Sequence, residues 1–129
     1  GEPWKTQYWS RFICEHAYHD KVEGLVGNED AGQMSAWYVL SACGLYPICP
    51  GDTRYEITSP LFNEITIKVG DNKTFVIKAH NNSTSNTYIQ SARLNGKEYS
   101  QCYLDYQDIM NGGVLVLEMG NAPNMHWGI

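Results

Sequence analysis

Residues 34–42 read Met34-Ser35-Ala36-Trp37-Tyr38-Val39-Leu40-Ser41-Ala42 and are the strongest clue to the fold, because they carry no charged side chain on any face. Its residue types predict a helix that ends at Gly44, since glycine is the most common residue just after a helix end. A helix without a polar face is normally packed on all sides. Two helices cannot bury that surface alone, so we expect this part of the chain to belong to a larger helical assembly.

A polar loop precedes this helix and reads Gly27-Asn28-Glu29-Asp30-Ala31-Gly32-Gln33. Asp30 and Gln33 have the spacing of a capping box, in which side chains satisfy the free N–H groups of a helix that begins near Asp30. Polar residues followed by two large aromatic residues are also typical of the rim of a sugar pocket. From residue chemistry alone, the helix cap is the more common use of such residues.

The neighbouring acids Glu29 and Asp30 do not form a complete glycosidase pair. The acid and base of an inverting glycosidase lie about 6.5–9.5 Å apart across the sugar, and sequence neighbours seldom face each other over a ligand. One of them can be half of such a pair, with its partner elsewhere. A calcium site is also open, because Asn28 and Glu29 offer oxygen atoms, but one short cluster supplies too few ligands.

A first helix is predicted over residues 3–19, with Pro3 suited to its first turn. One face of this helix is aromatic and carries Trp4, Tyr8 and Phe12, with Trp9 and Ile13 beside them. Aromatic residues at helical spacing belong to a core more often than to a sugar-stacking site. The chain has no initiator methionine and no signal peptide before this helix, so we expect it to be a piece of a longer protein.

Beyond a turn at Pro47–Pro50, apolar and polar residues alternate in short segments, which is typical of β-strands. The segments are residues 55–58, 65–69, 74–79, 87–92 and 114–119. Asn95-Gly96 adds the signal of a type I′ hairpin. Short strands at this spacing predict an antiparallel β-sandwich. We therefore expect an α+β chain, with helices in residues 1–50 and the sandwich in residues 51–129.

Composition excludes some classes of function. The formal net charge is −5 and the chain has no basic stripe, so we expect no nucleic-acid partner. No segment is long and apolar enough to predict a transmembrane span. The four cysteines have no metal-finger spacing; Cys43 and Cys49 are close enough in sequence to pair across a turn, but we expect them to stay reduced.

The string GNEDAGQMSAWYVLSACGLYPICPG, residues 27–51, closely resembles the signature of glycoside hydrolase family 92. The resemblance covers nearly the whole chain. It continues through Gly1–Gln7, Ser59–Phe62, Lys73–Phe75, Asn81–Ser83, Tyr88–Ala92, Leu94–Lys97 and Gly120–Asn124. Members of this family are calcium-dependent, exo-acting α-mannosidases, and many of them are bacterial and specific for α-1,2 linkages.

The resemblance implies an architecture. Family members have an N-terminal β-sandwich, an (α/α)₆ barrel and a C-terminal β segment packed on the barrel. Residues 1–50 would then be the last helices of the barrel with an active-site loop at 27–33, and residues 51–129 the C-terminal β-sandwich. The implied partners are mannose-containing glycans and the remainder of the polypeptide, and the implied cofactor is calcium. The implied location is secreted, periplasmic or on the surface of a bacterial cell.

The resemblance also implies roles for the polar loop. Asp30 matches the general base, and Asn28 and Glu29 would hydrogen-bond the sugar or the waters of the calcium ion. Some members carry an aspartate at the position of Asn28, where a second acid assists the base; an asparagine does not. The general acid is a glutamate upstream of this region, so the chain alone is expected to be inactive. The alternative is a non-catalytic carbohydrate-binding or structural β-sandwich module with a helical linker.

Overall fold

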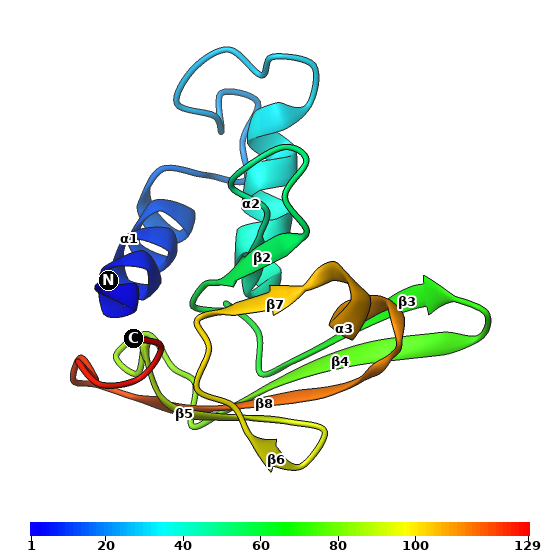
Figure 1. The fold of residues 1–129 in the computed structure, drawn as a ribbon. Coiled ribbons are helices and arrows are strands. Elements are labelled where there is room, and N and C mark those ends of the chain that lie inside the picture. Colours follow the sequence, from blue (N-terminus) through cyan, green and yellow to red (C-terminus); the bar gives the residue numbers. More distant parts are fainter.

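The computed structural model describes residues 1–129 and has the predicted α+β class. Two helices come first, and they stand to one side of two β-sheets (Figure 1). The elements are α1 (Pro3–His16), α2 (Gln33–Cys43), β1 (Leu45–Tyr46), β2 (Arg54–Ile57), β3 (Glu64–Gly70), β4 (Lys73–His80), β5 (Tyr88–Leu94), β6 (Lys97–Glu98), β7 (Tyr103–Asp105), α3 (Tyr106–Met110) and β8 (Gly113–Gly120). Every segment predicted as a strand from its alternation overlaps a strand in the structure, and only Thr58 and Thr87 lie outside the observed strands.

The strands form a three-stranded sheet in the order β1-β2-β7 and a five-stranded sheet in the order β3-β4-β8-β5-β6. All neighbouring strands are antiparallel except β4 and β8, which run parallel with Phe75 opposite Gly113. The expectation of a fully antiparallel sandwich is wrong for this pair. The chain leaves the large sheet through β7 and α3 and returns as β8 between β4 and β5, and this longer excursion permits a parallel return.

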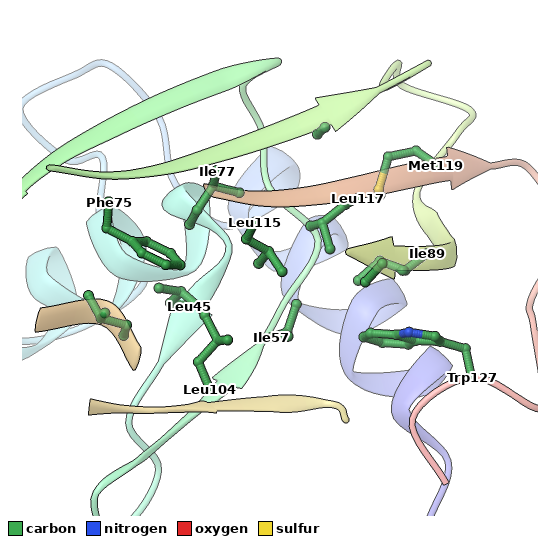
Figure 2. Close-up of a cluster of buried hydrophobic side chains, with 13 residues drawn as sticks. Leu45, Ile57, Phe75, Ile77, Ile89, Leu104, Leu115, Leu117, Met119 and Trp127 are labelled. Atoms are coloured by element: carbon green, nitrogen blue, oxygen red, sulfur yellow. The ribbon is translucent and has the colours of Figure 1, made fainter. Parts of the chain in front are cut away.

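A single apolar core fills the space between the two sheets (Figure 2). Phe75 and Ile77 from β4 and Leu115 and Leu117 from β8 point from the large sheet into this space, and all four are fully buried. They occupy alternate positions of their strands, because successive side chains of a strand point to opposite faces. The other members of the core are Leu45, Ile57, Ala79, Ile89, Ala92, Leu104, Ile109, Met119 and Trp127.

The predicted type I′ hairpin at Asn95-Gly96 is confirmed, whereas three short elements of the β region were not predicted. Asn95 and Gly96 have φ values of 52° and 80°, as a type I′ turn requires, and they join the paired residues Leu94 and Lys97. The sequence did not indicate β1, β7 or α3. β1 and β7 have two and three residues, too few to show an alternation, and α3 is a single short helix of five residues.

Helix α1 is shorter than predicted and packs with the opposite face. It ends at His16, with Ala17 as its C-cap, rather than at residue 19. Its buried side chains are Gln7, Ser10, Arg11 and Cys14. The aromatic face predicted to lie in a core points outward within this chain, with Tyr8, Trp9 and Phe12 exposed at 40%, 53% and 40%.

Arg11 is the centre of the contact between α1 and the sheets. It is 4% exposed, and its guanidinium donates to the backbone oxygens of Pro60 and Ser83 and to Oδ1 of Asn82 at 2.6 Å. Burial lowers the pKa of Arg11, and the carboxylate of Glu15, 3.6 Å from Nη1, acts against that shift. A buried charge of this kind is tolerated because several acceptors surround it.

Two further polar side chains of α1 bind backbone groups of the β region. Oε1 of Gln7 accepts from the N–H of Ile89 at 2.9 Å, and Oγ of Ser10 accepts from the N–H of Ser59 at 3.3 Å. These contacts satisfy backbone groups that burial under the helix would otherwise leave without a partner. Helix α1 is therefore held by polar contacts, and its aromatic face is left for other surfaces.

Helix α2 ends at Gly44, as predicted. Gly44 follows it with φ 96°, and its N–H donates to the carbonyl oxygens of Leu40 and Ser41. Only Ser41 and Ala42 of α2 are buried in this chain, although the helix has no charged residue. Most of its larger apolar residues are half-buried, and Val39 is 57% exposed.

The turn at residues 47–50, the cysteines and the helix lengths were also predicted from the sequence. The turn at residues 47–50 lies between β1 and β2, which pair with each other, and the division of the chain at residue 50 stays a prediction. All four cysteines are free, as expected for Cys43 and Cys49. None of the helices combines the length and the apolar character needed to cross a membrane.

We predict that Arg11→Met lowers the free energy of unfolding by about 3 kcal/mol, because hydrogen bonds to a charged group are strong and their loss leaves buried acceptors unpaired. Urea denaturation followed by tryptophan fluorescence measures this change. The matched control is Lys5→Met on the exposed side of the same helix, which should change the stability by less than about 0.5 kcal/mol. Equal effects of the two substitutions would show that Arg11 does not anchor α1.

Candidate active site

The polar loop of residues 27–32 lies at the end of α2 that is farthest from the sheets (Figure 1). Asn28 and Asp30 are exposed, and Glu29 is half-buried between them. The loop leads directly into α2, so the position of its side chains depends on how that helix begins. The structure therefore brings the three predicted site residues together at one exposed helix end.

The backbone of this loop is left-handed over three successive residues, a run that also occurs at residues 70–72 in the β3–β4 turn. Asp30, Ala31 and Gly32 have φ values of 49°, 58° and 90°, so three successive residues are left-handed. Only glycine adopts this conformation without cost, and a non-glycine residue there is uncommon. Such conformations persist where the surrounding contacts enforce them, and they are concentrated at functional sites.

The predicted capping box of Asp30 and Gln33 is wrong. The N-cap of α2 is Gly32, and no side chain of the N-cap bonds to the helix. The two left-handed residues after Asp30 carry the chain through an extra turn, so Asp30 lies three residues before the first helical residue instead of at the cap. Its side chain is therefore not used to close the helix.

Glu29 binds the beginning of α2 instead. Its Oε1 accepts from the N–H of Ser35 at 3.0 Å, and its Oε2 accepts from the hydroxyl of Ser35 at 2.8 Å. Ser35 is the third residue of α2, and its N–H is one of those that the helix itself leaves without a partner. A sequence search for caps misses this contact, because the capping carboxylate lies six positions before its partner.

Tyr18 packs against the aromatic residues of α2, next to the loop. The ring of Tyr18 stacks on Trp37 at 5.8 Å and lies 4.9 Å from the ring of Tyr38. The Tyr18 hydroxyl donates to the carbonyl oxygen of Met34 in the first turn of α2 at 3.0 Å. Burial raises the pKa of Tyr18, and Cys14 and Glu29 raise it further, which keeps the hydroxyl protonated as the donor.

A hollow of about 500 Å³ opens beside the loop. Among the residues that line it are Tyr18, Lys21, Leu25, Ser35, Tyr38 and Val39. Asn28, Glu29 and Asp30 are not among its lining residues. The chain thus carries one exposed wall with polar side chains, and it does not enclose a sugar-sized pocket around them.

The residues of this chain do not suffice for a metal site. No three His, Cys, Asp or Glu side chains lie close enough together to hold a metal ion. Calcium takes six to eight oxygen ligands, and the carboxylate of Glu29 is already bound to Ser35. Asn28 and Glu29 could therefore supply only a small part of a calcium site.

Comparison with known proteins places the chain in one class. The model of the glycosyl hydrolase family 92 catalytic domain matches residues 1–121. An uncharacterized secreted glycosidase of Arthroderma benhamiae is 35% identical over 114 residues, which are 86% of this chain and 14% of that protein. Both matches are to glycosidases.

Solved structures agree in both sequence and fold. A family GH92 inverting mannosidase from Bacteroides thetaiotaomicron VPI-5482 is 44% identical with a TM-score of 0.93, and a family GH92 alpha-mannosidase from Bacteroides thetaiotaomicron is 39% identical with the same TM-score. Each match covers 99% of this chain and 17% of the solved chain. The chain belongs to glycosyl hydrolase family 92, and it spans about a sixth of the length of these relatives.

We predict that Gly32→Val destabilises the protein by about 2 kcal/mol, because a β-branched residue strongly disfavours φ near 90°. The space around Gly32 is open, since an added Cβ would meet only Oε1 of Glu29 at 4.0 Å, so the cost comes from the backbone. Gly32→Asn is the control, because asparagine tolerates the left-handed region and should cost less than half as much. Thermal unfolding distinguishes the two, and equal stability of both variants would contradict a left-handed Gly32.

Proposed function

We propose that this chain is the part of an inverting exo-α-mannosidase that supplies the general base, and that Asp30 is that base. The complete enzyme, meaning the longer polypeptide that contains this segment, would remove terminal α-1,2-linked mannose from glycans. The observation that carries the proposal is the contrast between neighbouring acids. Glu29 is bound to Ser35, whereas Asp30 is exposed at the tip of a left-handed loop and takes no part in capping α2.

The relatives support the reaction type. One solved relative is named an inverting mannosidase, and another, named an alpha-mannosidase, has also been solved in complex with mannoimidazole. Inversion requires a carboxylate that activates water rather than one that attacks the sugar. An exposed carboxylate on a fixed loop suits this role, since it can reach a water molecule beside a bound sugar.

Asp30 would accept a proton from the attacking water as the water oxygen forms a bond to the anomeric carbon. The bond from that carbon to the leaving oxygen breaks on the opposite face, and a general acid gives the leaving oxygen its proton. We propose that this acid is a glutamate elsewhere in the complete enzyme. The chain alone would then be inactive, because an unprotonated leaving oxygen departs too slowly.

Asn28 is proposed to contact the sugar, because its exposed carboxamide lies two residues from Asp30 on the same loop. The prediction that Glu29 also binds the sugar stays a prediction. Calcium is proposed only as a cofactor of the complete enzyme, with most of its ligands outside this chain, since no three His, Cys, Asp or Glu side chains of this chain lie close together. No step of the mechanism here depends on it.

The open surfaces of the helices support a partner within the same polypeptide. Tyr8, Trp9 and Phe12 on α1 and Val39 on α2 are all at least 40% exposed. Exposed apolar area of this extent is typical of an interface. We propose that the remaining helices of the complete enzyme cover it. A secreted location is proposed as well, because one relative is described as a secreted glycosidase.

We predict that Asp30→Asn in the complete enzyme lowers kcat by at least about 1000-fold on an α-1,2-mannobioside, since an amide cannot accept the proton from water. Calorimetric binding of the mannobioside should change by less than about threefold, because the amide keeps the shape of the carboxylate. The matched control is Asp71→Asn in the β3–β4 turn. Asp71 is also exposed and left-handed, with φ 48°, so the same chemical change should leave kcat unaltered.

Near-normal turnover by the Asp30→Asn enzyme would remove Asp30 from the mechanism. Loss of turnover in both variants would indicate that an aspartate-to-asparagine change at such turns damages the fold. Activity on a terminal sugar other than mannose, with none on mannobiosides, would contradict the proposed substrate.

A further inference from the structure

We propose that Glu29 is a positioning residue that fixes Asp30 by binding its carboxylate to Ser35. The inference rests on the proposed function, because it assigns Glu29 a role through Asp30. It differs from the prediction that Glu29 binds the sugar or a calcium ion.

The carboxylate of Glu29 makes two contacts to one residue. Oε1 accepts from the backbone N–H of Ser35 at 3.0 Å, and Oε2 accepts from its hydroxyl at 2.8 Å. The backbone adds a third, longer contact, because the carbonyl oxygen of Glu29 accepts from the N–H of Met34 at 3.4 Å. A carboxylate at the first turn of a helix is further favoured by the positive end of the helix dipole. Both carboxylate oxygens of Glu29 are therefore already bound within this chain.

These contacts close a small ring around Asp30. The ring starts at Glu29, passes through Asp30, Ala31 and Gly32, and returns through the first turn of α2 to Ser35. Its backbone holds three successive left-handed residues, two of which are not glycine. Such a conformation relaxes unless contacts at both ends enforce it. The helix fixes one end of the ring, and the Glu29 carboxylate fixes the other.

Asp30 gains a defined position from this ring. Its own side chain does not cap α2, so the backbone sets the position from which the carboxylate extends. A catalytic group must be held to within about 0.5 Å of its working position, and a misplacement of about 1 Å can lower a rate by about 100-fold. Loss of the Glu29 contacts should therefore reduce the chemical step without removing any group that touches the sugar.

The test uses the complete enzyme with Glu29→Ala, Glu29→Gln and Ser35→Ala. Glu29→Ala should lower kcat by about 100-fold while KM changes by less than about threefold, since positioning acts on the chemical step and not on ground-state binding. Glu29→Gln should stay within about fivefold of the wild type, because its amide oxygen accepts from the Ser35 N–H and its amide N–H donates to the Ser35 hydroxyl oxygen. Ser35→Ala removes one contact of the two and should fall between them.

Hydrogen exchange of the segment 30–36 provides a readout that does not depend on activity. Glu29→Ala should speed exchange there, because the Ser35 N–H loses its acceptor, and Glu29→Gln should not. Glu23→Ala is the matched control, since Glu23 is an exposed glutamate of the preceding loop, and it should change neither kcat nor exchange.

The possible outcomes separate the roles. A raised KM at unchanged kcat in Glu29→Ala would show that Glu29 binds the sugar, and an inactive Glu29→Gln with normal exchange would show that its charge is needed; either result overturns the proposal. Faster exchange without a loss of kcat overturns it as well. If Asp30→Asn stays active, the proposed base is wrong, yet the exchange experiment still reports whether Glu29 holds the loop. If Glu29→Ala does not fold, Ser35→Ala and Glu29→Gln decide between these outcomes.

Discussion

The buried guanidinium of Arg11 is the interaction on which the arrangement of this chain depends. It joins helix α1 to the carbonyl oxygens of Pro60 and Ser83 and to the side chain of Asn82, and no other cation of the chain is buried. Because its polar partners lie in the β2–β3 and β4–β5 connections, the polar face of α1 must face inward. The aromatic face then points outward, where the rest of a family 92 enzyme is proposed to lie. The contacts of Arg11 thus determine that the aromatic face of α1 points away from the sheets.

The sheets contain the apolar core, whereas the helices hold the candidate site. The core between the sheets is apolar and fully packed, and it provides a rigid base. Helix α2 ends near the sheets at Gly44, and the loop of Asn28–Asp30 lies at its opposite end (Figure 1). The Cβ of an alanine at Gly44 would lie 3.2 Å from Cβ of Pro60, so the exit from the helix is also closely fitted. The loop shares its run of three left-handed residues with the β3–β4 turn at residues 70–72, and it differs from that turn in the Glu29 carboxylate that binds Ser35.

Much of the fold could be predicted from the sequence, because its signals are local. Alternation marked β4 and β8, Asn95-Gly96 marked a hairpin, and Gly44 marked the end of α2. The orientation of α1 could not be predicted in this way. An aromatic face normally points into a core, and only the distant acceptors on Pro60 and Asn82 make the polar face of α1 the buried one. The parallel pairing of β4 and β8 likewise depends on the path of the chain and not on either strand.

The sequence pointed to the residues of the candidate site, whose roles stay a prediction, and it did not reveal their contacts. The family resemblance pointed to Asn28, Glu29 and Asp30, and the structure brings them together at one helix end. The capping role fell on Glu29 rather than Asp30, because two left-handed residues shift the start of the helix. The left-handed Asp30 and Ala31 could not be anticipated, since neither residue type requires that conformation. Asp30 as the base remains a proposal, supported by the contrast between its exposed carboxylate and the bound carboxylate of Glu29.

If Asp30 activates water rather than attacking the sugar, the first-formed product has the inverted configuration. Proton NMR of the complete enzyme acting on an α-1,2-mannobioside can follow the anomeric signals before mutarotation. We predict that β-mannose appears first, because a water activated by Asp30 attacks from the face opposite the leaving group. The first appearance of α-mannose would contradict the account, since it would require a covalent intermediate and a nucleophilic carboxylate.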